Sequence, residues 1–469
     1  MNIRLTTSGR AKNKIYFIQK NTKNFEWQYL GEFTSSLKLS KEENYKIWYF
    51  IDQNFGYHIV VKYKKEKDLE ENMEDIVASL WDIIKTLDRV FHIDLDKLNL
   101  GDLQKQTFAE LLSIKIYEFT KLKSKDPNTN YWLLLKCKAF DNQKFETIVE
   151  SVDYCRDLVN LPTNLLSPDI YEKNIKERFE WVQNVDIKIF HKEKLRELGM
   201  WWIYEVWKWA ESWPRLIILE YKPSSKEEFD YALVWKWVCF DTWGYNLKPT
   251  GAMEDMKLDM GWAATATWVF NYLVNSWIQK NILVALPLVE NTIDWSAYKP
   301  GDIITMYNGS TVEIANTDAE WRLVMADAIS YIQEQYSISH LFDIATLTGA
   351  QVVALGNKVA AMVGNNSKLN NKIQKLSWQI KDRCWELPYY TPYFKQYKSY
   401  AADMKNVNPN RLSPWTITAG LFLSQFVDNK NWVHFDIAGP VGLMSGSDPV
   451  WWEWASGFLV RTLCRYIEQ

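Results

Sequence analysis

The stretch PRLIILEYKPSSKEEFDYALVWKWVCF, residues 214–240, contains two apolar runs separated by a polar, turn-rich segment. A third apolar run, HLFDIATL, follows at 340–347, and helical patterns at about 262–280 and 321–336 lie between the second and third runs. Apolar strands that alternate with helices are typical of parallel strands joined by crossover helices. The sequence therefore predicts an α/β domain with a mixed, mostly parallel central sheet flanked by helices on both faces.

The chain before this region has the pattern of a second, smaller α/β domain. The run YHIVVKY (57–63) is typical of a strand, and the acidic start and helical spacing of apolar residues at 68–91 predict an amphipathic helix. A further strand is expected at 131–140, after a polar loop. We place the domain boundary near residue 150, which gives an N-terminal α/β domain at 1–150 and a second domain at 151–469.

The overall composition is that of a soluble globular protein. Of 469 residues, 47% are hydrophobic and 24% are charged, and the net charge of -3 disfavours both disorder and a nucleic-acid-coating role. The sequence shows no signal-peptide pattern and no membrane-spanning run, so we expect a cytoplasmic protein. Five scattered cysteines without a CxxC pair indicate neither a disulfide framework nor a thiolate zinc cluster, and we expect them to be reduced and mostly buried.

One count is out of line with this ordinary composition. The chain has 25 Trp and 18 Gly, whereas a Gly content of about 7% predicts roughly 33 Gly for this length. Either the protein has an unusual need for indole rings, or Trp stands at positions where Gly is expected.

Polar residues that interrupt the ends of apolar strands carry the chemical signal of the second domain, because a buried charge must be paired or bound to a metal. At 312–328 an expected strand runs into Asp318, Glu320 and Arg322. Side chains two residues apart in an extended chain point to the same side. We therefore expect these three side chains to project into one space.

Two further clusters, at 235–251 and 253–267, add two lysines and two aspartates: Lys236, Asp241, Lys248 and Asp259. Four carboxylates that lie close together repel one another unless cations lie among them, and such a set can bridge two divalent ions that orient a water and polarise a carbonyl. Lys236 can be a ligand only as the neutral amine, which nearby dications enforce. Lys248 and Arg322 would stay cationic and stabilise oxyanion charge.

Structural explanations of the same residues remain open from their pattern alone. Acidic residues are common at helix starts, so the four carboxylates could be loop acids, caps or salt-bridge partners. A lone lysine at a strand end, such as Lys236, is commonly a surface residue with a packed stem. The histidines show no metal-ligand spacing, and we interpret all five as structural or surface residues: His58, His92, His191, His340 and His434.

The string NTDAEWRL (316–323) resembles the signature NTDAEGRL of the leucyl aminopeptidases, the cytosol aminopeptidase family. Other segments look like family segments in family order: RDLVNLPTNLLSP (156–168), KWVCFDTWGYNLKP (236–249), MKLDMGWAAT (256–265), YKPGDIITMYNGSTVEI (298–314), ATLTGAQVVALG (345–356) and HFDIAGP (434–440). The resemblance is strong over about 150–469, whereas the N-terminal part matches only in being a smaller α/β domain of suitable size.

The resemblance implies two divalent metal ions per subunit, with manganese or zinc as the main candidates. The ligands of the tighter site would be Lys236, Asp241, Asp259 and Glu320, and those of the exchangeable site Asp241, Asp318 and Glu320. Lys248 and Arg322 match the two catalytic cations of the family, and Arg322 would hold a bicarbonate ion that acts as general base.

Other implications of the resemblance concern the substrate and the assembly. Met256 and Leu347 fall where the family lines the pocket for the first side chain and binds the substrate backbone. Family members act on peptides and are typically homohexamers, so we expect a homohexamer with peptide substrates and no membrane or nucleic-acid partner.

The main departure from the family is a set of tryptophans at positions where it has glycine: Trp201, Trp202, Trp207, Trp209, Trp235, Trp237, Trp243, Trp262, Trp295, Trp321, Trp451, Trp452 and Trp454. Glycines beside ligands serve positive φ or close backbone approach, which an indole cannot replace. Our hypothesis is that UGA codons, read as Gly in the source organism, were written as Trp. Trp385 and Trp432 suit the family and look genuine, and the alternative is a truly Trp-rich protein with stacking surfaces.

These observations together predict a metal-dependent aminopeptidase that hydrolyses the N-terminal peptide bond through a water activated by two metals. The alternative is a catalytically impaired homologue that acts as a scaffold or as a regulatory or DNA-binding protein. Retention of all five expected metal ligands argues against the alternative, because unneeded buried charges would have to be compensated.

Overall fold

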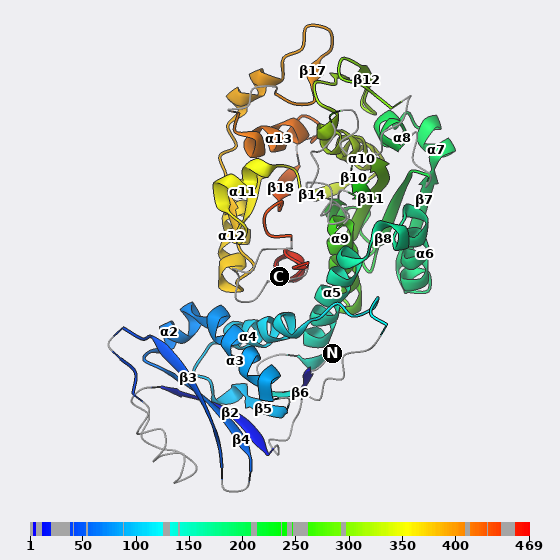
Figure 1. Cartoon of the computed structure of the whole chain (residues 1–469). Coiled ribbons are helices and arrows are strands. Elements are labelled where there is room, and N and C mark those ends of the chain that lie inside the picture. Colours follow the sequence, from blue (N-terminus) through cyan, green and yellow to red (C-terminus); the bar gives the residue numbers. More distant parts are fainter. Residues whose placement is uncertain are drawn as a thin grey trace. The chain divides into compact units, whose positions relative to one another are not determined.

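The computed structural model describes residues 3–5, 12–19, 38–40, 42–52, 55–87, 89–124, 132–138, 141–207, 213–235, 237–241, 246, 261–291, 297–408, 413–428, 430–441 and 455–469. These residues form two compact units that divide between Val149 and Glu150 (Figure 1). The division falls inside one helix, α5 (Asn142–Asn160), so the chain passes from one unit to the other without a loop.

The first unit is built on a six-stranded sheet in the order β1-β6-β5-β2-β4-β3. Its strands are β1 (Ile3–Leu5), β2 (Asn13–Gln19), β3 (Tyr45–Ile51), β4 (Tyr57–Tyr63), β5 (Val90–Asp94) and β6 (Trp132–Lys136). Neighbouring strands are parallel except in the β3–β4 hairpin. Its helices are α2 (Glu66–Glu71), α3 (Met73–Leu87), the 3-10 helix η1 (Leu95–Lys97) and α4 (Asp102–Ile116). The predicted smaller α/β arrangement is therefore present.

The single helix predicted at 68–91 is wrong in two places. The helix is interrupted at Asn72, whose backbone N–H and side chain both bond to the carbonyl of Asp68, and a second helix starts at the next residue. Val90, which fits the helical spacing, begins strand β5 instead. Apolar periodicity alone does not separate a helix end from a strand that follows it closely.

The second unit contains a nine-stranded sheet, counted over the described residues, in the order β16-β15-β18-β14-β9-β11-β8-β7, with β10 paired to β11. The strands are β7 (Val185–His191), β8 (Arg215–Tyr221), β9 (Phe229–Trp235), β10 (Trp237–Asp241), β11 (Ile282–Asn291), β14 (Ile338–Ala345), β15 (Ala360–Gly364), β16 (Cys384–Glu386) and β18 (Asn431–Asp436). The central strands β18, β14, β9 and β11 are parallel, and β8, β7 and the β15–β18 pair add antiparallel contacts. This confirms the predicted mixed, mostly parallel sheet.

Helices cover both faces of this sheet, as the sequence predicts. Along β9, Ala232 and Val234 join the apolar core beneath α8 (Trp201–Trp207) and α10 (Trp321–Gln335), together with α13 (Trp415–Ser424). The ring of Tyr231, on the opposite face, contacts Tyr466 of α14 (Val460–Glu468), and α14 packs on α9 (Gly261–Asn275) (Figure 1). The side chains that alternate along β9 therefore contribute to two apolar cores, one on each face of the sheet.

The remaining described elements are short or peripheral. They are the helices α6 (Pro168–Phe179), α7 (Lys192–Glu197), α11 (Gly349–Leu355) and α12 (Ser367–Gln379), the 3-10 helices η2 (Thr163–Leu165), η4 (Thr317–Ala319) and η5 (Thr391–Tyr397), and a small sheet of β12 (Ile303–Thr305), β13 (Thr311–Glu313) and β17 (Met404–Lys405). None of the helices in the described ranges is long and apolar enough to cross a membrane.

The described residues of the apolar run at 231–240 are in strand conformation on both sides of position 236, which lies outside the described residues. β9 lies between β14 and β11, whereas β10, which begins two residues after β9 ends, pairs with the far end of β11. Its register with β11 is irregular between Val238 and Asp241. β9 and β10 pair with successive parts of the ten-residue β11, so the described residues of the expected strand follow one edge of β11.

The described cysteines agree with the expected reduced state. Cys137, Cys155, Cys384 and Cys464 form no disulfide bond, and the last three are buried. Burial raises the pKa of the Cys155 and Cys384 thiols to about 12, so both stay protonated and unreactive at neutral pH.

Tryptophan side chains at expected glycine positions are described at four of the thirteen sites: Trp201, Trp202, Trp235 and Trp321. Trp202 and Trp235 are fully buried, and no hydrogen-bond acceptor in the described part of the chain meets their indole Nε1. A buried donor left in this way costs about 1–3 kcal/mol. Another residue, Trp277, follows α9 with a φ of 54°, the left-handed conformation that glycine most often supplies after a helix.

Candidate functional site

The segment after β13 carries Asp318, Glu320 and Arg322 in helical rather than extended conformation. Residues Thr317–Ala319 form η4, and α10 begins at Trp321. The extended conformation predicted from the sequence is therefore wrong for this segment. Asp318 and Arg322 are four residues apart, so they share a helical face, and both line a pocket. Glu320 is absent from this lining and is fully buried.

The helical start has a local cause that the sequence contains. Asn316 has extended backbone and its side-chain Oδ1 accepts a 2.9 Å hydrogen bond from the N–H of Asp318. Asparagine is among the strongest N-cap residues, so this residue ends the extended chain and begins the turn. The carboxylates that follow it lie at the start of α10, where the helix dipole favours negative charge.

Two amide side chains from distant loops hold this segment in place. Asn246 exchanges hydrogen bonds of 2.9 Å with Thr317, through its own N–H and through its Oδ1. Asn406, which is fully buried, accepts from the N–H of Ala315 at 2.8 Å and donates to the carbonyl of Asn316 at 2.6 Å. The first contact brings Asn246 to the site, and Lys248, which lies outside the described residues, follows two residues later in the sequence.

Replacing Asn406 with alanine is expected to lower the free energy of unfolding by about 2–4 kcal/mol, because buried backbone groups of residues 315–319 lose their partners. Urea denaturation of the variant measures the change. Asn371→Ala, at an exposed position of α12, is the matched control and should stay within about 0.5 kcal/mol of the parent. Equal stability of the two variants would contradict this account of the loop.

Arg322 is a buried cation with a neutral partner. Its side chain is 5% exposed, its Nη1 donates a 3.0 Å hydrogen bond to the hydroxyl oxygen of Tyr397, and its guanidinium lies 6.0 Å from the centre of the Phe422 ring. Its Nε is buried and meets no acceptor within the described ranges. The guanidinium therefore keeps both charge and donor capacity for a pocket ligand.

The loop after β14 forms another wall of the pocket and is fixed by a buried carboxylate. Asp436, at the end of β18, accepts hydrogen bonds from the N–H of Leu347 at 3.0 Å and from the hydroxyl of Thr348 at 2.6 Å. The Thr348 hydroxyl also bonds to that of Thr416 in α13, at 2.8 Å. Burial raises the pKa of Asp436, and the charge of His434 and the hydrogen bonds oppose this rise. Asp436 thus fixes the position of Leu347, one of the expected substrate-binding residues.

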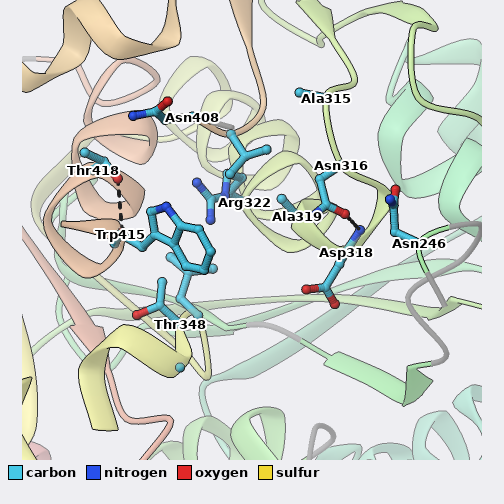
Figure 2. A pocket seen from close by; sticks show the side chains of 13 residues that line it. Asn246, Ala315, Asn316, Asp318, Ala319, Arg322, Thr348, Asn408, Trp415 and Thr418 are labelled. Atoms are coloured by element: carbon cyan, nitrogen blue, oxygen red, sulfur yellow. Dashed lines mark hydrogen bonds between the residues drawn. The ribbon is translucent and has the colours of Figure 1, made fainter. Parts of the chain in front are cut away.

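The pocket enclosed by these elements has a volume of about 330 Å³. Its lining residues are Asn246, Ala315, Asn316, Asp318, Ala319, Arg322, Leu347, Thr348, Gly349, Val407, Asn408, Trp415 and Thr418. Figure 2 shows Asp318 and Arg322 reaching it from one segment, with Thr348, Trp415 and Thr418 contributed by the neighbouring loop and α13. A carboxylate and a buried guanidinium thus face one cavity that is large enough for a small organic group.

The structure describes only part of the predicted site. Asp318, Glu320, Arg322 and Leu347 are described in full, and the backbone of Asp241 ends β10. The other predicted residues, together with the Asp241 side chain, lie outside the described residues: Lys236, Lys248, Met256 and Asp259. Among the residues that are described, no three His, Cys, Asp or Glu side chains group as a metal site would require. The fully buried Glu320 beside Asp318 nevertheless has the oxygen chemistry that suits divalent cations, and such a buried carboxylate requires a compensating charge.

Several residues that shape the pocket have no counterpart in the sequence-based prediction. Asn246, Asn406, Asp436 and Tyr397 act through hydrogen bonds to backbone groups or to other side chains of the site. Such contacts follow no periodicity and join positions far apart in the chain. The one sequence signal that was available is Asn316, whose capping tendency predicts the helix start at this site.

Comparisons with known proteins give a consistent picture. Residues 153–464 match the model of the cytosol aminopeptidase family, catalytic domain. The chain is 34% identical to the cytosol aminopeptidase of Pseudomonas aeruginosa over 421 residues, which cover 86% of this chain and 83% of that protein. It is 37% identical to a probable cytosol aminopeptidase of Pseudomonas fluorescens over 322 residues, 69% of this chain, and spans 64% of the length of that relative.

Solved structures show the same fold. The crystal structure of the cytosol aminopeptidase from Coxiella burnetii is similar with a TM-score of 0.84 and 24% identity, and the alignment covers 100% of this chain and 99% of that one. The bottromycin maturation enzyme BotP, in complex with Mn, has a TM-score of 0.83 and 24% identity, with 98% and 100% covered. Similarity at these identities shows that the architecture of both described units is shared.

Proposed function

The chain belongs to the cytosol aminopeptidase family and is thus a peptidase, and we propose that it is a metal-dependent, leucyl-type aminopeptidase that hydrolyses the N-terminal peptide bond of peptides. The observation that carries this proposal is the pairing of Asp318 and Arg322 on one helical face of a single pocket, with the buried Glu320 between them in sequence. A carboxylate for a metal and a cation for an anion would then act on the same substrate.

The metal ligands would come from five residues, of which two are described with their side chains. Asp241, Asp318 and Glu320 would hold the exchangeable ion, and Lys236, Asp241, Asp259 and Glu320 the tighter one. Two divalent ions, Mn or Zn, would supply Lewis acidity and lower the pKa of a bound water. The manganese complex of the structural neighbour BotP supports the choice of Mn.

The protein side chains would orient the substrate and stabilise the negative charges at the site. Arg322 would hold a bicarbonate ion as general base, since its buried guanidinium has donors directed at the pocket and no carboxylate partner within the described residues. Lys248 would stabilise the oxyanion of the tetrahedral intermediate. Leu347, fixed through Asp436, would bind the substrate backbone, and Met256 would line the pocket for its first side chain.

Removal of metal is expected to abolish cleavage of Leu-p-nitroanilide, because both the water and the scissile carbonyl depend on the ions. Dialysis against EDTA should lower kcat/KM by about 100-fold or more, and Mn²⁺ or Zn²⁺ should restore it. N-acetyl-Leu-p-nitroanilide, which lacks the free amine, is the control substrate and should resist cleavage. The assay uses the chain as written and a version with glycine at the thirteen Trp positions, and absence of metal-dependent cleavage in both would overturn the proposal.

We also propose a cytoplasmic homohexamer, on the basis of family membership alone. Light scattering during size-exclusion chromatography tests the assembly, since a hexamer has six times the chain mass of 55.4 kDa.

A further inference from the structure

We propose that Tyr397 is a positioning residue of this active site, whose hydroxyl group orients the Arg322 guanidinium toward the pocket without neutralising it. The inference rests on the proposed function, in which Arg322 binds an anion beside the metals. Tyr397 lies at the end of η5, and Arg322 lies in the first turn of α10.

The contact between the two residues is buried and well defined. Tyr397 is 1% exposed and Arg322 is 5% exposed, and the Nη1–Oη distance is 3.0 Å. Among the described residues, the Arg322 side chain makes this one hydrogen bond. Other torsions of a long arginine side chain would point the guanidinium elsewhere, so one buried acceptor at a fixed place decides its direction.

The neutrality of the acceptor matters as much as its position. A carboxylate paired with Arg322 would form a strong bidentate contact and satisfy the charge. A tyrosine hydroxyl accepts one hydrogen bond and leaves the positive charge uncompensated. The remaining guanidinium donors, including the buried Nε, then stay available for an anion in the cavity that Arg322 lines.

The aromatic surroundings of Tyr397 hold its hydroxyl in place. The ring packs against Phe394 of the same 3-10 helix at 5.7 Å and against Phe422 of α13 at 5.6 Å between centroids. Phe422 also lies beneath the guanidinium of Arg322, at 6.0 Å. One ring of α13 thus supports both members of the pair, and removal of the hydroxyl alone should leave this packing intact.

The test is Tyr397→Phe, which deletes the acceptor and keeps the ring. We expect kcat for Leu-p-nitroanilide to fall about tenfold while KM stays within about twofold, because substrate binding does not use the lost contact. The melting temperature should change little. Tyr393→Phe, in the same 3-10 helix, is the matched control and should behave as the parent. An unchanged kcat in Y397F, or an equal loss in Y393F, overturns the proposal.

A second measurement separates an effect through Arg322 from a general one. Calorimetric titration with bicarbonate should show a severalfold weaker affinity in Y397F and none of this weakening in Y393F. In the Arg322→Ala background Y397F should cost nothing further, and a tenfold loss there would refute a role through Arg322. If turnover of R322A is below detection, the kcat and bicarbonate data of Y397F decide. A parent chain that binds bicarbonate but cleaves nothing would defeat the proposed function and leave this inference standing.

Discussion

Replacement of Glu320 by glutamine is expected to lower kcat/KM for Leu-p-nitroanilide by about 1,000-fold or more, equivalent to roughly 4 kcal/mol of transition-state stabilisation. Glu320 is fully buried at the start of α10, and the proposed site uses it as a ligand of both ions. Glutamine keeps the shape and removes the charge, so two cations would share one carboxylate fewer.

The fold of the variant should survive this substitution. In the metal-free protein a neutral amide is less costly to bury than a carboxylate, so the melting temperature should not fall. The control is Glu334→Gln, at an exposed position of the same helix, which should retain activity within about twofold. Activity of E320Q close to that of the parent would show that Glu320 is not a metal ligand.

The second large effect is expected from replacing tryptophan with glycine at the thirteen positions. The glycine version should show metal-dependent turnover at least about 100-fold above the chain as written, because an indole at a position that requires glycine adds strain of about 1–3 kcal/mol. Among the described residues, Trp202 and Trp235 show such a cost, because each buries an indole Nε1 without a hydrogen-bond acceptor.

A conservative version of the experiment isolates the backbone requirement. Trp277→Gly places glycine at a φ of 54° on a largely exposed surface and should raise the melting temperature slightly, whereas Trp385→Gly, at a position where Trp looks genuine, should not. Peptide masses of the natural protein decide the origin of the tryptophans. Tryptophan at position 321 in an active enzyme purified from its source would end the recoding hypothesis.

The architecture of the second unit could be predicted because its signal is local. The buried strands β8, β9 and β14 are continuous apolar runs, and the helices between them are long enough to show their period. The irregular register between β10 and β11 could not be predicted, since it depends on how two segments about 50 residues apart in the chain pair.

The charged residues of the candidate site could be predicted from the sequence, but their arrangement in space could not. The carboxylates and the arginine stand out as polar residues at strand ends, but the extended conformation assumed for Asp318 to Arg322 was wrong, because these residues form a 3-10 turn and the first turn of α10. The side-chain amide of Asn406 and the hydroxyl of Tyr397 contact residues that lie roughly 80 positions earlier in the sequence. A single sequence contains no signal that pairs residues over such a distance.

The short turn from Asn316 into α10 has a consequence for how the enzyme would discriminate between ions. Asp318, Glu320 and Arg322 fall within five residues of one capped helix start that Asn406 ties down. If this segment moved as one piece, an ion of unsuitable radius that pushed Asp318 outward would also displace the guanidinium four residues later. The identity of the metal would then mainly change kcat, because the bicarbonate base held by Arg322 would be misaligned. The affinity of the protein for the ion would change only weakly.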